Sequence, residues 1–221
     1  MKVKYISNDW NEPNLTENKI YYVIAVEFSN SDTMSGNYIK YRILNDMNQV
    51  RPYSAKNFDI LSGELSSNWV YNARSTNDYS LIPSEIAYAT FWEDFYNDDK
   101  IALELFQSSY LRIFMEGASN DEINEYLFSN NEYEVALILR GLRKTENSNF
   151  INEVVELVKK KFSLFSAFSY FKATPLIVEC FNYLSKMGGN LVDDFFIKYY
   201  ENLEWQCEEL DAIVKDFYSR Q

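Results

Sequence analysis

The sequence predicts an α+β protein in which a small N-terminal β-barrel precedes an all-α domain, either a helical bundle or a short helical repeat. Up to about residue 62 the apolar residues alternate with a period of two, which is typical of strands. Beyond about residue 83 they recur with the 3.6-residue period of amphipathic helices. With 47% hydrophobic residues, 6 Gly and 4 Pro among 221, the chain has the composition of a folded protein. We therefore expect a barrel over 1–62, a linker or loop over 63–82 and a helical domain over 83–221.

Five short strands are predicted in the first region. The clearest alternation of β-branched and aromatic residues covers 20–28, and Pro52 marks one of the other strands as an edge. Five short strands in about 60 residues pack most economically as a small, partly closed barrel. The predicted strands cover 3–6, 20–28, 38–44, 49–53 and 58–61.

Four segments of this region share a sequence pattern: KIYYV at 19–23, YRILND at 41–46, RPY at 51–53 and NFD at 57–59. Together they resemble a small Src-homology-3-like module that is common at the front of bacterial proteins. The chain departs from that pattern at three positions, with Asn18 and Asn48 where glycines are usual and Asn45 where the first Asp is usual. The resemblance covers about a quarter of the chain and implies a fold, because the module has no catalytic residues to carry over.

Seven to nine helices are predicted after residue 83. Pro83 stands at a first helical position, Ser119 and Glu122 have capping-box spacing, and Gly117 and Gly188 follow helical patterns as stop signals. The final segment is one long helix or two helices with a kink near Asn202. The predicted helices cover 83–96, 99–117, 119–128, 132–142, 149–162, 175–188 and 191–218.

The composition excludes several classes of function. The chain has no histidine, which excludes a histidine general base, a Ser–His or Cys–His dyad and a histidine metal ligand. A net charge of −12 argues against non-specific binding to nucleic acid or anionic lipid. The longest apolar stretch, 162–171, is shorter than the roughly 20 residues that span a bilayer. The N-terminus lacks a signal-peptide pattern, so we expect a cytoplasmic protein with no membrane contact, in which Cys180 and Cys207 are unpaired thiols.

The acidic residues are unevenly distributed. The first 80 residues carry a net charge of −1 and the remainder −11, so the helical region is expected to hold nearly all of the charge. On one continuous helix Glu201, Glu204 and Glu208 would share a face, because they are spaced i, i+3, i+7. Such clusters are either a solvated face or a surface for a basic partner, and a site for a divalent metal such as Mg²⁺ is a third alternative. The candidate partner-binding residues are Glu201, Glu204, Glu208, Glu209, Asp211, Glu116, Asp121, Glu122 and Glu125.

The sequence carries no nucleotide-binding or nucleophile-elbow motif, and we expect neither a catalytic site, a metal nor a cofactor. Its acidity and two-part organisation resemble the immunity proteins of bacterial toxin–immunity systems, including contact-dependent inhibition. That resemblance implies a binding protein that neutralises a basic toxin domain, often a nuclease. Two alternatives remain: an enzyme or small-ligand domain with a site between barrel and helices, and a peptide-binding adaptor with an exposed aromatic groove around Tyr38, Tyr41 and Tyr53.

Overall fold

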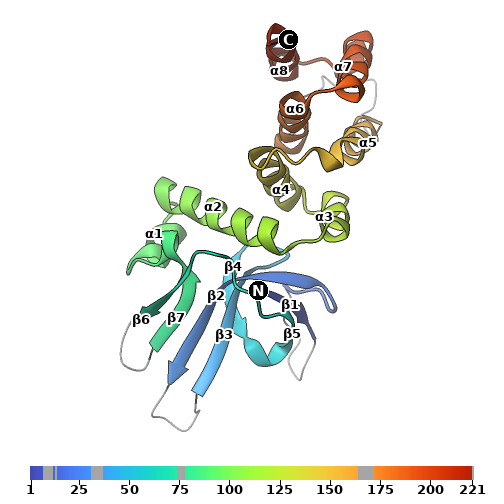
Figure 1. Ribbon diagram of the computed structural model, residues 1–221. Helices are drawn as coiled ribbons and strands as arrows, with labels where there is room; N and C mark the ends of the chain where they lie inside the picture. Colours follow the sequence, from blue (N-terminus) through green and yellow to red (C-terminus); the bar gives the residue numbers. More distant parts are fainter. Residues whose placement is uncertain (7–11, 13, 31–36, 74–77, 164–171, 221) are drawn as a thin grey trace. The chain divides into compact units, whose positions relative to one another are not determined.

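The computed structural model describes every residue except 7–11, 13, 31–36, 74–77, 164–171 and 221 (Figure 1). It confirms an α+β chain in which an antiparallel sheet over residues 2–83 precedes eight α-helices. The chain divides into two compact units, Met1–Ala118 and Ser119–Gln221, named here the sheet unit and the helical unit. The boundary between compact units thus lies at residue 118, and the first two α-helices belong to the sheet unit.

Seven antiparallel strands form the sheet. Along its main path the order is β4-β3-β2-β1-β5, and β7 pairs with both β2 and β6. The long strand β2 uses one edge for two partners, since its residue Tyr22 is paired with β1 whereas Val26 is paired with β7. The strands are β1 (Lys2–Tyr5), β2 (Ile20–Asn30), β3 (Asn37–Leu44), β4 (Val50–Ser54), β5 (Phe58–Ser62), β6 (Trp69–Ala73) and β7 (Asp78–Pro83).

The sheet is not closed into a barrel, whereas the sequence predicted a small, partly closed one. Strands β4 and β5 are the two ends of the main path, and a short 3₁₀ helix, η1 (Ala55–Asn57), connects them. Among the described residues no strand pairing joins β4 to β5. The physical reason lies in β2, because an 11-residue strand that shares one edge between β1 and β7 makes the sheet branch.

The segment predicted as a linker or loop, 63–82, contains β6 and most of β7, although residues 74–77 lie outside the described part. The alternating stretch in β7 is short: Asp78 and Ser80 alternate with Tyr79 and Leu81. Four alternating residues in a polar context are a weak sequence signal. Pairing with β2, which is distant in sequence, and with the neighbouring strand β6 stabilises the strand.

Residues 21–26 of β2 are buried on both faces of the sheet. On one face Tyr21 and Val23 join a core that includes Tyr5 and Phe58. The other face is covered by helix α2 (Lys100–Gly117), whose Phe114 ring lies 4.7 Å from that of Tyr22. This arrangement explains why β2 is apolar at consecutive positions and not only at alternate ones.

The helices of the sheet unit begin later than predicted, because β7 continues to Pro83 and a 3₁₀ helix, η2 (Ser84–Ile86), follows it. Asp99 caps α2, and Ser119 and Glu122 form the expected capping box at the start of α3. The other α-helices are α1 (Phe91–Tyr96), α3 (Asn120–Leu127), α4 (Glu132–Lys144), α5 (Ile151–Phe162), α6 (Pro175–Met187), α7 (Asn190–Glu201) and α8 (Glu208–Ser219), with 3₁₀ helices η3 (Ser148–Phe150) and η4 (Leu203–Trp205).

In the helical unit the six α-helices form two rows. Helix α6 contacts α4 on one side and α8 on the other, and α5 likewise contacts α3 and α7 (Figure 1). The aromatic ring of Phe181 on α6 lies at the centre of the core, 5.1 Å from Tyr199 and 5.6 Å from both Phe195 and Phe196. Successive helix pairs therefore stack by burying a shared apolar layer.

None of the helices in the described residues is both long and apolar enough to cross a membrane. Of the apolar stretch 162–171, residues 164–171 lie outside the described part.

Candidate partner-binding surface

The last two α-helices are separated by a turn and are not one continuous helix. Helix α7 ends at Glu201, and the side chain of Asn202 accepts a hydrogen bond from the backbone N–H of Glu204, at 3.3 Å. The 3₁₀ helix η4 follows, and α8 begins at Glu208. The expected i, i+3, i+7 face therefore does not form, because Glu201, Glu204 and Glu208 lie on three different elements.

The turn nevertheless gathers four carboxylates within nine residues of sequence. All four are exposed, and none forms an ion pair among the described residues. Between them Leu203 is 80% exposed, the highest value among the large hydrophobic side chains in the described residues. We call this surface the α7–α8 corner; it consists of Glu201, Leu203, Glu204, Glu208 and Glu209.

Asp211, the fifth predicted acid of this segment, is directed inward. Its Oδ1 accepts a hydrogen bond from the hydroxyl of Tyr199, at 2.8 Å, and the same hydroxyl oxygen accepts one from the backbone N–H of Cys207, at 3.3 Å. Burial, together with the nearby Asp211 carboxylate, raises the pKa of Tyr199 above its ordinary value. Asp211 therefore holds the start of α8 against α7.

The position of three of these acids at the start of α8 gives a local reason for their presence. Glu208, Glu209 and Asp211 occupy its first turn, where carboxylates interact favourably with the positive end of the helix dipole. This effect requires no partner and accounts for acids at 208–211. It does not account for Glu201, which is the last residue of α7 and stands at the negative end of that helix.

The other predicted acids have different surroundings. Asp121 and Glu125 are exposed on α3, whereas the Glu122 side chain accepts the capping-box hydrogen bond from the backbone N–H of Ser119, at 2.7 Å. Glu116 belongs to the sheet unit and accepts two hydrogen bonds from Ser67, each of 3.0 Å. Of the nine predicted residues, Glu116 thus belongs to the sheet unit, three lie on or at the start of α3, and five lie between the end of α7 and the first turn of α8.

The two compact units carry equal net charge, although residues 81–221 hold −11 of the total of −12. The sheet unit has 16 acidic and 10 basic residues and the helical unit has 17 and 11, so each carries a net charge of −6. The difference arises because α1 and α2, with their acidic residues, belong to the sheet unit.

Many basic residues of the helical unit are bound to acidic ones. The buried carboxylate of Glu179 on α6 lies 2.7 Å from Arg140 and 3.4 Å from Arg143, both on α4. Further pairs are Glu132–Lys161, Glu156–Lys159, Glu146–Lys186 and Asp216–Arg220. These contacts fix helices to one another or to their own turns, and they leave the α7–α8 corner without a compensating base among the described residues.

A groove that the sequence did not predict lies between α4, α6 and α8, with a volume of about 430 Å³. Arg143, Lys186 and Arg220 line it, each near the C-terminal end of one helix. The basic residues at the ends of these helices are visible in the sequence. They do not by themselves predict a groove, because basic residues at helix C-termini commonly complement the helix dipole. Each of the three pairs with an acid, and Arg220 also donates to the hydroxyl of Ser185, at 2.8 Å.

The aromatic groove on which the adaptor alternative depends is not formed by the three expected tyrosines. Tyr41 and Tyr53 are buried in the core of the sheet, and only Tyr38 is exposed. The hydroxyl of Tyr53 accepts a hydrogen bond from the amide of Asn45, at 2.8 Å, which fixes it inside the fold. Among the described residues no group of three or more potential ligands is placed to hold a metal ion.

Comparison of the chain with protein-family models, with curated proteins and with solved structures gives no match.

Proposed function

We propose that this chain is a non-catalytic binding protein that captures a basic protein partner at the α7–α8 corner. The observation that carries the proposal is the set of four exposed carboxylates around Leu203, without an ion pair in the described residues. Four like charges within nine residues repel one another, so the corner is electrostatically unfavourable in isolation. A basic partner relieves this repulsion when it binds.

The composition of the corner suits a protein partner more than a simple counter-ion. Leu203 offers an exposed apolar contact, and the carboxylates that flank it in the sequence offer hydrogen-bond acceptors. An apolar centre with a polar rim is the usual organisation of a protein–protein interface. The charges act mainly on the association rate, because they attract the partner over a distance of about the Debye length, ~10 Å at 0.1 M salt.

The stacked helix pairs support the same proposal. Chains built from stacked helical pairs present extended surfaces and commonly act by binding. In this unit the α7–α8 corner lies at the last pair, where α8 has a stacked neighbour, α6, on one side. We propose that the unit is a short helical repeat and that its last pair is the recognition element.

The class of partner that we propose is a basic toxin domain, which makes the chain an immunity protein acting in the cytoplasm. Immunity proteins must capture a toxin before it acts, and electrostatic attraction gives the fast association that this requires. We further propose that the sheet is a branched relative of the Src-homology-3-like module. Its Lys19, Tyr21 and Asp46, all within the resembling segments, are bound to one another.

The test begins with the gene beside this one in the host genome. We expect it to encode a large secreted protein with a basic C-terminal domain. That domain, purified, should bind the chain rapidly, and co-expression of the chain should restore growth of cells that produce the domain. Replacing Glu204, Glu208 and Glu209 by Lys should slow association about tenfold or more and reduce its dependence on salt.

A matched control replaces three exposed acids of the sheet unit, Glu17, Glu64 and Glu93, by Lys. Both triple variants have the same net charge, so only the position of the charge differs. The control should bind within about twofold of the wild type. Equal loss of binding in the two variants, or unchanged binding in both, would contradict the choice of the α7–α8 corner. A neighbouring gene without a basic domain, together with no growth protection, would contradict the toxin proposal.

A further inference from the structure

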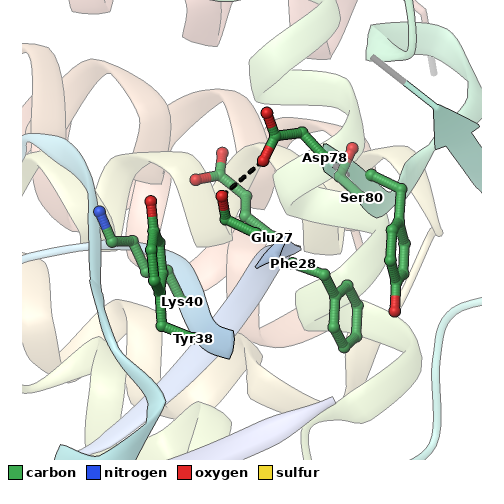
Figure 2. A pocket seen from close by; sticks show the side chains of 8 residues that line it. Glu27, Phe28, Tyr38, Lys40, Asp78 and Ser80 are labelled. Carbon is green, nitrogen blue, oxygen red and sulfur yellow. Dashed lines mark hydrogen bonds between the residues drawn. The ribbon is translucent and has the colours of Figure 1, made fainter. Parts of the chain in front are cut away.

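The sheet unit contains a polar pocket that the proposed function does not use. It has a volume of about 230 Å³ and lies on three neighbouring strands, β3, β2 and β7 (Figure 2). Strand pairing places its polar residues in two rows across these strands. One row is Lys40, Glu27 and Ser80, and the next row is Tyr38, Ser29 and Asp78.

The guanidinium of Arg42 holds the Glu27 carboxylate in a fixed position. Two nitrogens of the Arg42 guanidinium, Nε and Nη2, each lie 2.8 Å from its Oε1. Arg42 is itself held by the hydroxyl of Tyr96, at 2.7 Å, and by the ring of Trp92, whose centroid is 4.1 Å away. Both contacts to Glu27 use Oε1, and Oε2 has no hydrogen bond among the described residues.

Because the Glu27 carboxylate is paired with Arg42, it is not paired with the neighbouring Lys40. Lys40 is directly opposite Glu27 in the strand pairing, yet the two side chains form no ion pair. Instead the Lys40 ammonium lies 5.0 Å from the ring centroid of Tyr38. The pocket therefore contains an ammonium group that no carboxylate neutralises in the described part of the chain.

Ser80 provides a second, independent indication of a ligand. Its side chain is 1% exposed, and its hydroxyl has no hydrogen-bond partner among the described residues. Buried hydroxyls almost always have a partner, because leaving one unpaired is costly. Ser80 lines the pocket, so a molecule bound there can supply the missing hydrogen bond.

We propose that this pocket binds a small zwitterion, a free amino acid or a molecule of similar size. The carboxylate of the ligand pairs with the Lys40 ammonium, and the ligand ammonium donates to Glu27 Oε2 and to the Ser80 hydroxyl. Asp78, to which the Ser29 hydroxyl donates, adds negative charge at the β7 side. The ligand thus lies along one row, with its negative end on β3 and its positive end between β2 and β7.

Size and charge separation favour this class over others. Neighbouring strands are about 4.8 Å apart, so three strands span roughly 10 Å, which matches a short zwitterion and its hydrogen bonds. A volume of about 230 Å³ lies below the range of about 300–1,000 Å³ that is typical of drug-sized ligands, which favours a small molecule. A neutral sugar would leave the Lys40 ammonium without a counter-charge.

The experiment is a calorimetric titration of the full chain with glycine, L-serine and γ-aminobutyrate, which differ in the distance between amine and carboxylate. We expect at least one to bind with a dissociation constant on the order of a millimolar or tighter. Methylamine and acetate, which carry only one of the two groups, should bind at least tenfold more weakly. Glucose serves as the neutral probe and should not bind.

Two variants locate the site. Lys40→Met keeps the aliphatic stem and removes the charge, and it should weaken binding of the zwitterion at least tenfold. Ser80→Ala should also weaken binding, yet raise the Tm of the ligand-free protein by a few degrees, because it removes an unpaired buried hydroxyl. Ser109→Ala is the matched control, since Ser109 on α2 also has a buried, unpaired hydroxyl but lies outside this pocket. It should raise the Tm without changing binding.

Three outcomes overturn the proposal. The first is no heat of binding for any of the three amino acids at 10 mM, a concentration about tenfold above the weakest expected dissociation constant. The second is binding that both Lys40→Met and Ser80→Ala leave unchanged, which would place the site elsewhere. The third is binding of glucose at least as tight as that of the amino acids, which would identify the pocket as a sugar site. None of these results bears on the α7–α8 corner, since the pocket and the corner lie on different units.

Discussion

In the sheet unit acidic side chains accept bonds from residues far away in the sequence, whereas at the α7–α8 corner they face solvent. Asp46 binds three groups of the 16–21 segment, Glu27 binds Arg42, and Glu85 binds Arg112 at 2.6 Å. The two units carry the same net charge, so the difference lies in placement. Ion pairs such as Glu179–Arg140 also join helices of the helical unit, but the four acids of the α7–α8 corner take no part in them.

This contrast suggests a division of roles. A helical unit that derives its stability from buried aromatic rings can expose a cluster of acids with little loss, because those acids are not needed for folding. In the sheet unit Glu27, Asp46 and Glu85 bond to distant parts of the fold, and removing such a bond should lower stability. The predictions below test that distinction, beginning with the largest expected effect.

The apolar layer of the helical unit should be the most sensitive region. Replacing Phe181 by Ala removes a fully buried ring that contacts rings of α5 and α7, and we expect the free energy of unfolding to fall by about 4 kcal/mol. Urea denaturation followed by circular dichroism measures the loss. Leu203→Ala is the control and should change stability by less than about 0.5 kcal/mol, because its side chain is exposed. Equal effects of the two substitutions would contradict the assigned core.

Breaking the Arg42–Glu27 pair should have the next largest effect. Arg42→Met leaves Glu27 with a half-buried charge and removes the contact to Tyr96, so we expect a loss of about 3 kcal/mol. Adding Glu27→Gln should recover part of that loss, since no unpaired charge then remains. A double variant less stable than Arg42→Met alone would show that Glu27 is stabilised by something other than Arg42.

The third prediction concerns pH. Burial alone would raise the pKa of Asp46, but hydrogen bonds from Lys19, Thr16 and Tyr21 outweigh it and lower the pKa below its ordinary value. A lowered folded-state pKa stabilises the protein above the unfolded pKa of about 3.9, and this contribution disappears as the pH falls through the folded value.

Asp46→Asn should therefore reduce stability by about 2 kcal/mol at pH 7 and flatten the decline of stability below about pH 4. Urea midpoints from pH 7 down to pH 2.5 measure both effects. The matched control is Asp59→Asn, an exposed position on β5 that should leave the pH profile unchanged. A decline in the Asp46→Asn variant as steep as in the wild type would contradict this role of Asp46.

Local signals predicted the helices better than the strands. The capping box at Ser119 and the proline that begins the helix after Thr174 each act within one helical turn, so the sequence alone locates them. Strand β7 was missed because its stability depends on pairing with β2, which lies about 50 residues earlier. That the sheet is not closed could not be predicted for the same reason, since closure depends on which distant edges meet.

The candidate sites likewise could be predicted only where their residues are close in sequence. The acids of the α7–α8 corner could be found from sequence because they are close in sequence, although the proposed helical face was wrong. The sheet pocket could not be found, because Glu27, Lys40 and Ser80 come from three strands whose register no local pattern determines. Two positions at which the chain departs from the Src-homology-3-like pattern have an unusual backbone conformation. Asn18 and Asn48, which stand where glycines are usual, both have positive φ, 64° and 57°.

That observation leads to the smallest predicted effect. Asn18 is exposed and adopts a left-handed conformation that asparagine and glycine tolerate but β-branched residues do not. We expect Asn18→Val to lower the free energy of unfolding by about 1–2 kcal/mol, and Asn18→Gly to change it by less than about 0.5 kcal/mol. The control is Glu17→Val, because the exposed neighbour has no positive φ and should tolerate the change. If both valine variants lose the same stability, side-chain chemistry in this loop explains the result and backbone strain does not. The glycine positions of the pattern would then not mark a required left-handed conformation in this chain.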